Sequence, residues 1–511
     1  MIIIYHNGSE VVAVSNSFNL DKANKLSIIG FLLLLAKEYP DGILAWCHIS
    51  LKEQLNISEI EKLFHHHKLL LSYNPSDTLF LDKSIGYVEE SPFIKINKSV
   101  TFPTWQMSSM VGGIHSSVLL ALKSEVTYDK DFDYFLSSLA KLGMRKGLLC
   151  YSEPKLLKQN TSGLSTRTNT YILFRFVKQH YKTQWTFLLL LNLLLYERRF
   201  PIGPFMYSLF YKNRSKITIN LDSIIAQSSK KVIDKRTIDV IIPTIGRKKY
   251  LHDVLMDLKS QIHLPTNVII VEQNPNDGSK SDLDYLTNEI WPFAIKHIFT
   301  HQAGACNARN IALEEIKSEW VFFADDDIRL ENNFILKALE HINKFGIKAV
   351  SVKCFQKEKH QKENVIFQWM TFGAGCSFVF ADSLKNCKFK KGYEFGFGED
   401  GDFGMQLRNC GHDVLYLPEP EILHLKAPVG GFRSQPELQW QKDAIQPKPS
   451  PTIMLYQILN NTQEQVRGYK TTLFFKYYKY QTIKNPISYF MTYRKQWERS
   501  VFLANELIKR E

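Results

Sequence analysis

The chain has 511 residues, which is too many for a single hydrophobic core and predicts two to four domains. Its hydrophobic fraction of 44% and aromatic fraction of 13% are typical of a folded protein and exclude a disordered one. The formal net charge of +13 favours a polyanionic partner, such as nucleic acid, an anionic membrane face or a phosphate-bearing substrate.

The cysteines and the apolar runs indicate the compartment. Seven cysteines occur without a CxxC pair, which argues for a reducing compartment and against a disulfide framework or a zinc site. The start, Met1–Tyr5, lacks the basic region and cleavage site of a signal peptide. The longest apolar runs, 28–36 and 185–196, are shorter than the ~20 residues of a membrane span. We therefore expect a cytoplasmic protein, with peripheral attachment to the inner face of the membrane as a further expectation.

The first part of the chain carries no motif of known chemistry. Residues 1–175 alternate apolar runs with polar turns and predict an α/β domain. The histidines of His65–His67 are adjacent and share no helix face, so a solvated turn is favoured over a metal cluster. Residues 176–236 predict a helical hairpin and a polar linker. The hairpin, Phe176–Tyr211, either packs on the domain or lies in a membrane interface, and packing is favoured.

A second domain begins at Thr237 and is expected to extend to residue 430. Short apolar strands are predicted at 238–242, where Pro243 would end the strand, and at 267–271, 295–299 and 320–324, with helices at 249–262 and 303–316. This order predicts an α/β fold with a mainly parallel central sheet. The glycine fingerprint of dinucleotide-binding domains and the phosphate loop GxxxxGKS or GxxxxGKT do not occur, which argues against a dehydrogenase or a P-loop enzyme.

Three carboxylates, Asp325, Asp326 and Asp327, directly follow the apolar strand at 320–324. Burying like charges close together at the end of a strand costs free energy, and a bound divalent cation such as Mg²⁺ or Mn²⁺ would reduce this cost. Ligands of open α/β sheets also bind at the carboxyl ends of strands. A solvated acidic turn that caps the next helix is an equally good interpretation of these residues alone.

Two further loops carry donors that suit phosphate. In Pro243–Arg247, Thr244 offers a hydroxyl and Arg247 a charge-assisted donor to phosphate or base, although a turn with a helix cap fits as well. The helix that opens at Gly304 carries Arg309, which could reach a phosphate, fix the aspartate cluster or form a structural salt bridge.

A second acidic group lies at a glycine-rich helix start. Glu399, Asp400 and Asp402 precede or enter a helix predicted at 403–409, where the helix dipole favours anions, so a well-capped helix is the simple alternative. Two separate acidic groups, one suited to a metal and one free, are what a metal-assisted displacement with a general base requires.

Residues 237–430 resemble glycosyltransferase family 2, inverting enzymes of the GT-A fold. The resemblance rests on four motifs in order, Ile241–Thr244, Ala308–Asn310, Asp325–Asp327 and Gly398–Asp400. It implies a nucleotide-sugar donor, with a UDP-sugar expected, and a glycan or lipid-linked acceptor, as in bacterial-type surface polysaccharide or glycan assembly. The cofactor that it implies is a divalent metal, Mn²⁺ or Mg²⁺.

The resemblance also implies roles for individual residues. Asp327 looks like the metal-binding end of the DXD motif, with Asp325 or Asp326 toward the ribose or the metal. Asp400 looks like the base that deprotonates the acceptor hydroxyl, and His424 is placed like a downstream histidine that completes the metal site. Glu272 stands where members often have an aspartate that reads the base. The remaining residues expected at the donor site or in the acceptor loop are Pro243, Thr244, Arg247, Arg309, Glu399 and Asp402.

The first half of the chain echoes the second. The segments 113–119, 131–133 and 151–154 resemble 375–379, 400–402 and 416–420 in sequence. The aspartate cluster has no counterpart there, and the nearest segment is Phe80–Lys83. We hypothesise a diverged, inactive GT-A-like copy within 1–175; two unrelated domains are the alternative.

Residues 431–511 are predicted to be helical, basic and aromatic. The stretch Arg467–Arg499 suits the headgroup zone of an anionic membrane, but a helical pair packed on the catalytic domain is slightly favoured. The rival function is a non-catalytic glycan- or anion-binding scaffold on a GT-A fold. Nucleic acid is not expected as a partner, because no basic–aromatic platform occurs outside the helical stretches.

Overall fold

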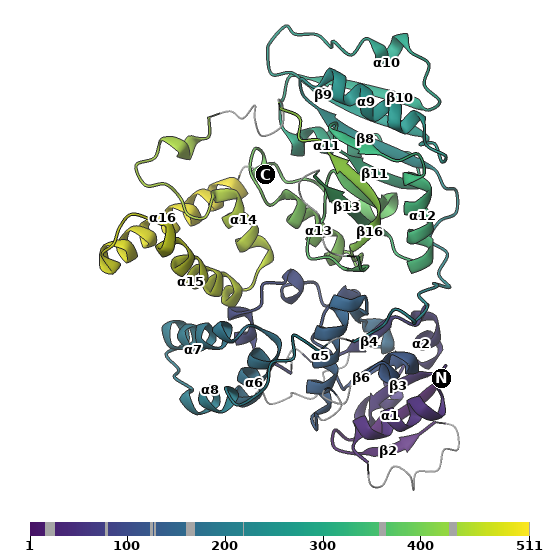
Figure 1. The fold of residues 1–511 in the computed structure, drawn as a ribbon, viewed down its shortest axis with the longest axis vertical. Helices are drawn as coiled ribbons and strands as arrows, with labels where there is room; N and C mark the ends of the chain where they lie inside the picture. The colour runs from purple at the N-terminus through teal and green to yellow at the C-terminus, as the bar shows by residue number, and fades with distance from the viewer. Residues whose placement is uncertain are drawn as a thin grey trace. The chain divides into compact units, whose positions relative to one another are not determined.

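The computed structural model describes residues 1–15, 26–76, 80–122, 126, 129–159, 169–217, 219–356, 364–428 and 437–509. These residues form two compact units (Figure 1). The first contains Met1–Lys230 and Thr462–Lys476, and the second contains Lys231–Asn461 and Tyr477–Glu511. The division differs from the expected domains, because the region 431–511 is shared between the two units.

The first unit is built on a seven-stranded mixed sheet in the order β2-β1-β3-β6-β4-β7-β5. Its strands are β1 (Ile2–His6), β2 (Val11–Val14), β3 (Ile43–His48), β4 (Leu69–Tyr73), β5 (Phe102–Pro103), β6 (Val111–His115) and β7 (Leu149–Ser152). The central strands are buried along their whole length, as in a sheet covered on both faces. Its helices are α1 (Ile28–Glu38), α2 (Ile57–Leu63), α3 (Ser116–Leu120), α5 (Phe132–Gly143), α6 (Thr170–His180), α7 (Thr183–Glu197) and α8 (Ile202–Ser208).

Two expectations for this unit need correction. The segment expected to be a hairpin forms three helices, α6, α7 and α8. Pro204 does not break α8, because it lies in the first turn, where a proline removes no helical hydrogen bond. The turn of His65–His67 is not fully solvated. His66 is buried, and the His65 ring is hydrogen-bonded to Ser228 Oγ at 2.8 Å. Burial lowers the pKa of His66 to about 3.

The second unit contains a nine-stranded sheet in which β10-β9-β8-β11-β15-β13-β16-β12 are neighbours in that order and β14 pairs with β16. Its strands are β8 (Ile238–Thr244), β9 (Asn267–Gln273), β10 (Ala294–Thr300), β11 (Trp320–Ala324), β12 (Ile328–Leu330), β13 (Ala349–Phe355), β14 (Phe367–Gln368), β15 (Cys376–Phe380) and β16 (Leu415–His424). The four strands β10, β9, β8 and β11 run parallel, so their carboxyl ends meet at one edge of the sheet. Strand β8 continues through Pro243, because β11 pairs with it only as far as Ile241 and no ladder bond to β11 is lost.

The helices of the second unit place two groups that matter for the site. They are α9 (Lys248–Lys259), α10 (Tyr285–Asn288), α11 (Ala305–Leu313), α12 (Phe334–Phe345), α13 (Glu399–Asn409), α14 (Pro451–Asn460) and α16 (Pro486–Ile508), while α15 (Gln463–Tyr480) is divided between the units. Helix α13 begins at Glu399, four residues before the expected start, so Asp400 lies in its first turn. Among the residues that the structure describes, no helix is long and apolar enough to cross a membrane.

The two sheets share a topology. In the first unit β1, β3, β6, β4 and β7 are joined by parallel, antiparallel, antiparallel and parallel pairings. In the second unit β8, β11, β15, β13 and β16 are joined by the same series of pairings and in the same chain order. The short strands β5 and β14 also correspond, since each runs antiparallel to the last strand of its series.

This correspondence bears on the hypothesis of a diverged copy. The sequence segment 113–119 begins on β6 and continues into α3, and 375–379 lies mostly on the corresponding strand β15. The segments 131–133 and 400–402 lie at the starts of α5 and α13. The counterpart of β11 is β3, which ends at His48, so Phe80–Lys83 is not the counterpart of the aspartate cluster. The first unit pairs β1 with the antiparallel β2, where the second unit has the parallel strands β9 and β10. We keep the diverged copy as a proposal, which this topology supports.

Candidate active site

A cavity of about 490 Å³ lies at the carboxyl ends of the parallel strands of the second unit. It is bounded by the ends of β8, β11 and β16 and by the first turns of α11 and α13. Ten residues predicted from the sequence line it, namely Pro243, Thr244, Arg247, Arg309, Asp325, Asp326, Asp327, Glu399, Asp400 and His424. The fold therefore brings together groups that are up to 181 residues apart in the chain, here Pro243 and His424.

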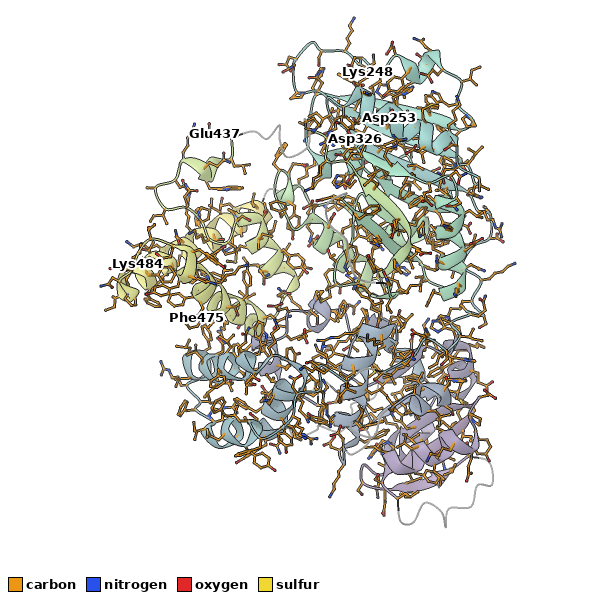
Figure 2. All side chains as sticks on the ribbon, viewed as in Figure 1. Lys248, Asp253, Asp326, Glu437, Phe475 and Lys484 are labelled. Carbon is orange, nitrogen blue, oxygen red and sulfur yellow. The ribbon has the colours of Figure 1, made fainter. Side chains whose placement is uncertain are left out.

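The middle aspartate, Asp326, has a structural role. Its carboxylate is 3% exposed and accepts hydrogen bonds from Thr244 Oγ1 at 2.7 Å and from the Arg247 guanidinium at 2.6 Å. Burial raises the pKa of Asp326 to about 6, against the opposing effect of Arg247 and Thr244. Thr244 and Arg247 therefore hold the acidic cluster in place rather than offering free donors to a ligand. Figure 2 labels Asp326 in the second unit.

The outer aspartates form a candidate metal site with a histidine from β16. One ligand atom from each of Asp325, Asp327 and His424 lies within 4.8 Å of the others. The His424 Nε2 atom is 3.1 Å from Asp327 Oδ1, and the Ala427 backbone N–H donates to Asp327 Oδ2 at 2.8 Å. Although burial opposes it, these hydrogen bonds hold the pKa of Asp327 below its ordinary value. The hydrogen bond to Asp327 raises the pKa of His424.

This donor set suits a divalent cation. Two carboxylates and one imidazole are ligands that Mn²⁺ accepts, and Asp325 and His424 remain partly exposed to the cavity. The approach of Asp325 depends on Gly375, because a Cβ at that position would overlap with the Asp325 carboxylate. The residues that would hold the metal thus fit it in chemistry and in spacing.

Asp400, in the first turn of α13, also lines the cavity. Its carboxylate accepts a hydrogen bond from the Ala374 backbone N–H at 3.2 Å. Burial, with the nearby negative charge of Glu399, raises the pKa of Asp400 to about 7, and Arg309 partly opposes this rise. A carboxylate with a pKa near neutrality is suited to accept a proton and later release it.

Arg309 joins the two acidic groups. Its guanidinium lies 3.1 Å from Asp325 Oδ1, and its positive charge also acts on Asp400 and Glu399. The buried Arg309 Nε–H has no hydrogen-bond acceptor among the described residues.

Two predicted residues do not line the cavity among the described residues. Glu272 on β9 lies 2.9 Å from the ring of His297 on β10, and its neighbour Gln273 lines the cavity instead. Successive side chains on a strand point to opposite faces, so only one of the two can face the site. Asp402 is 1% exposed and accepts hydrogen bonds from Lys390, Tyr393 and Asn460, so it anchors α13 to its neighbours.

Sequence reasoning missed three residues at the cavity. Gln273 accepts a hydrogen bond from the Gly304 N–H at 2.6 Å and so fixes the start of α11. Glu394 caps the same helix by accepting from the Cys306 and Asn307 N–H groups. Lys426, two residues after His424, has a left-handed backbone with φ +56° and offers a cation to the cavity. The strained backbone at Lys426 is not visible in the sequence, and Glu394 pairs with α11 only through the tertiary fold.

The parallel strands β10, β9, β8 and β11 of this mixed sheet, with an acidic cluster at their carboxyl ends, define the class of the second unit as a GT-A glycosyltransferase domain. Residues 239–404 match the model of the family described as "Glycosyl transferase family 2", and this segment is a domain of that family. The match covers less than half of the chain. A comparison with curated protein sequences gave no significant match.

Solved structures show more distant similarity. A crystal structure of S. aureus TarS 1–349 matches this chain at 18% identity, covers 37% of this chain and 60% of that chain, and has a TM-score of 0.30. The structure of TarS 1–349 in complex with UDP matches at 12% identity, covers 54% of this chain and 92% of that chain, and has a TM-score of 0.36. GalNAc-T7 with UDP, GalNAc and Mn²⁺ matches 41% of this chain and 48% of that chain at 13% identity with a TM-score of 0.30. Similarity at this level carries no argument about substrate or mechanism.

Proposed function

We propose that the chain is an inverting, metal-dependent glycosyltransferase that moves a sugar from a nucleoside-diphosphate donor to an acceptor hydroxyl. The observation that carries the proposal is that Asp400 and the group of Asp325, Asp327 and His424 line one cavity in a family 2 domain. The divalent cation that these three side chains would hold supplies positive charge to the leaving diphosphate.

The donor side of the cavity is supported by cations. Arg309 lines the cavity, and Lys426 lies beside the candidate metal ligand His424, so both can contact the diphosphate. Gln273, at the end of β9, replaces Glu272 as the side chain that we expect to contact the nucleobase. A UDP-sugar remains the expected donor, as the resemblance to family 2 implies.

The acceptor side is assigned to Asp400. Its carboxylate would take the proton of the acceptor hydroxyl while that oxygen forms the new bond at the anomeric carbon and the diphosphate leaves from the opposite face. Asp400 comes from α13, whereas the metal group comes from the ends of β11 and β16, so separate side chains are available for the base and for the metal. We propose a glycan or lipid-linked hydroxyl acceptor in surface polysaccharide or glycan assembly.

The scaffold alternative predicts no chemistry at this cavity. Against it, Asp400 is held partly buried with a pKa of about 7, and no ion pair satisfies it among the described residues. Maintaining such a group costs stability, which a binding scaffold has no reason to incur.

The proposal is tested by incubating the full chain with Mn²⁺ and a panel of nucleotide sugars and measuring release of the nucleoside diphosphate. We expect release from at least one UDP-sugar, its loss on chelation of the metal, and its loss in Asp400→Asn. Release that is equal in Asp400→Asn and wild type would refute the role of Asp400. Absence of both release and nucleotide binding would favour the scaffold.

A further inference from the structure

Helices α7 and α8 of the first unit expose an apolar surface. The two helices lie side by side (Figure 1), with the rings of Phe187 and Phe205 5.0 Å apart. Six large apolar side chains on or directly after these helices are between 44% and 85% exposed, namely Phe187, Leu194, Leu195, Ile202, Met206 and Phe210. We call these residues the α7–α8 surface. Several large exposed apolar side chains on two adjacent helices are a feature of interaction sites.

The composition of α7 explains why this surface exists. From Trp185 to Tyr196 every residue except Thr186 and Asn192 is apolar, so the helix is apolar on nearly all sides. A helix of this kind is normally buried all round. Only one stripe of α7 is buried here, formed by Thr186, Leu189, Asn192 and Leu193. The opposite side therefore lacks the apolar environment that its sequence requires.

The length of α7 sets how it could meet a bilayer. Its 15 residues extend over about 22 Å, which is shorter than the roughly 30 Å of a hydrocarbon core. One stripe is also occupied by the packing of the first unit. A helix with these properties can lie in the plane of the interface, with its free face among the upper acyl chains.

The segment that carries the surface is almost entirely positive in charge. Glu197 is the only acidic residue between Asn169 and Ile217, and it forms an ion pair with Arg199 at 3.0 Å. Five cationic side chains of the same stretch are exposed, namely Lys182, Arg198, Arg199, Lys212 and Lys216. Anionic lipid headgroups complement this charge. A second copy in a two-fold arrangement would instead place like charges near one another.

We propose that the α7–α8 surface docks on an anionic lipid bilayer, with α7 in the plane of the membrane. This places the membrane contact in the first unit rather than in the C-terminal region. Helix α16 buries Tyr489, Tyr493 and Trp497, which are three of the aromatic residues expected at a headgroup zone. The inference rests on this surface alone and does not depend on the proposed transfer reaction.

The test is co-sedimentation of the full chain with vesicles of phosphatidylcholine alone or with about 30% phosphatidylglycerol, at about 0.1 M and 0.5 M salt. We expect binding to the anionic vesicles that falls at the higher salt. The double variant Leu195→Glu with Phe210→Glu should lower the vesicle partition coefficient at least tenfold. Both side chains are more than half exposed, so the fold should persist, which the melting temperature and circular dichroism will check.

Two further variants serve as matched comparisons. Ile57→Glu, at an exposed apolar position at the start of α2 in the same unit, should leave vesicle binding unchanged. Arg198→Ser with Lys212→Ser should lower the preference for anionic over neutral vesicles several-fold.

Three results would overturn the proposal. The first is no binding of the wild type to either vesicle. The second is loss of binding in Ile487→Glu with Phe490→Glu, on the exposed side of α16, while Leu195→Glu with Phe210→Glu still binds. The third is a wild type that binds no vesicles but self-associates, with the self-association abolished by Leu195→Glu with Phe210→Glu. This result would identify a second copy of the chain as the partner. Nucleotide release is measured on all variants, so failure of docking can be told from failure of the transferase assignment.

Discussion

The substitution Asp400→Asn tests both the chemistry and the electrostatics of the cavity. The pKa of Asp400 is raised from 3.8 to about 7, first by burial and then by Glu399. Because folding favours the protonated form, the stability that this group contributes is complete below about pH 4 and is lost as the pH rises through 7. At about 1.4 kcal/mol per pKa unit, a shift of about three units sets an upper limit near 4 kcal/mol.

We expect about half of that limit, roughly 2 kcal/mol, because Asp400 is only partly buried and solvent screens part of the cost of its charge. The amide introduced by Asp400→Asn cannot ionise, so the variant should exceed the wild type in stability by about this amount at pH 8 and match it near pH 4. The assay is urea unfolding of both proteins across this pH range.

Turnover by the same variant should fall at least about 100-fold at pH 8, because the acceptor proton has lost its base, while donor affinity stays within a few-fold. Asp382→Asn is the matched control, because Asp382 is an exposed carboxylate of the same unit that pairs with the exposed Lys385, and it should change turnover and stability little. A stability difference that does not vary with pH, or full turnover by Asp400→Asn, would refute the reasoning.

Four other substitutions probe the surroundings. Asp327→Ala should abolish the stabilisation by Mn²⁺ with UDP in thermal unfolding, because it removes one ligand and the partner of His424. Gly375→Ala should weaken Mn²⁺ binding at least tenfold in a metal titration, because its Cβ would displace Asp325. Glu399→Gln should move the acidic limb of the pH–rate profile to lower pH by up to about one unit, because it removes a negative neighbour of Asp400. Arg247→Ala should cost about 3 kcal/mol in urea unfolding, because it leaves Asp326 buried without its ion pair.

The position of the acidic cluster could be predicted from the sequence for a physical reason. The apolar run 320–324 fixes a buried strand, and the end of a parallel strand is where a sheet binds its ligand. The roles within the cluster could not be predicted in the same way. Asp326 differs from its neighbours because Thr244 and Arg247, 79 or more residues away, point at its carboxylate.

The choice between Glu272 and Gln273 shows where strand patterns give no answer. Strand β9 is buried along most of its length, so its sequence carries no alternation that reveals which side chains face the cavity. The register with β8 and β10 decides it. The capping of α11 by Glu394 is another long-range contact that local sequence cannot indicate.

The first unit was only partly predictable. The echoed segments of the sequence lie on corresponding elements, but they do not show that β3, ending at His48, takes the place of β11. No run of three aspartates follows β3, and the described part of this unit has no parallel partners like β9 and β10. A diverged copy of this kind would therefore lack a donor site. The exposed face of α7 was also not predictable, because periodicity cannot show which sides of an apolar helix are covered.

The central claim is that one cavity separates donor binding from proton transfer. It is tested most directly by calorimetric titration of UDP, with and without Mn²⁺, into the wild type, Asp400→Asn and Asp327→Ala, with turnover measured on the same preparations. The account predicts metal-dependent UDP binding in the wild type and in Asp400→Asn, turnover in the wild type alone, and neither binding nor turnover in Asp327→Ala. UDP binding that needs no metal, or that survives unchanged in Asp327→Ala, would contradict it.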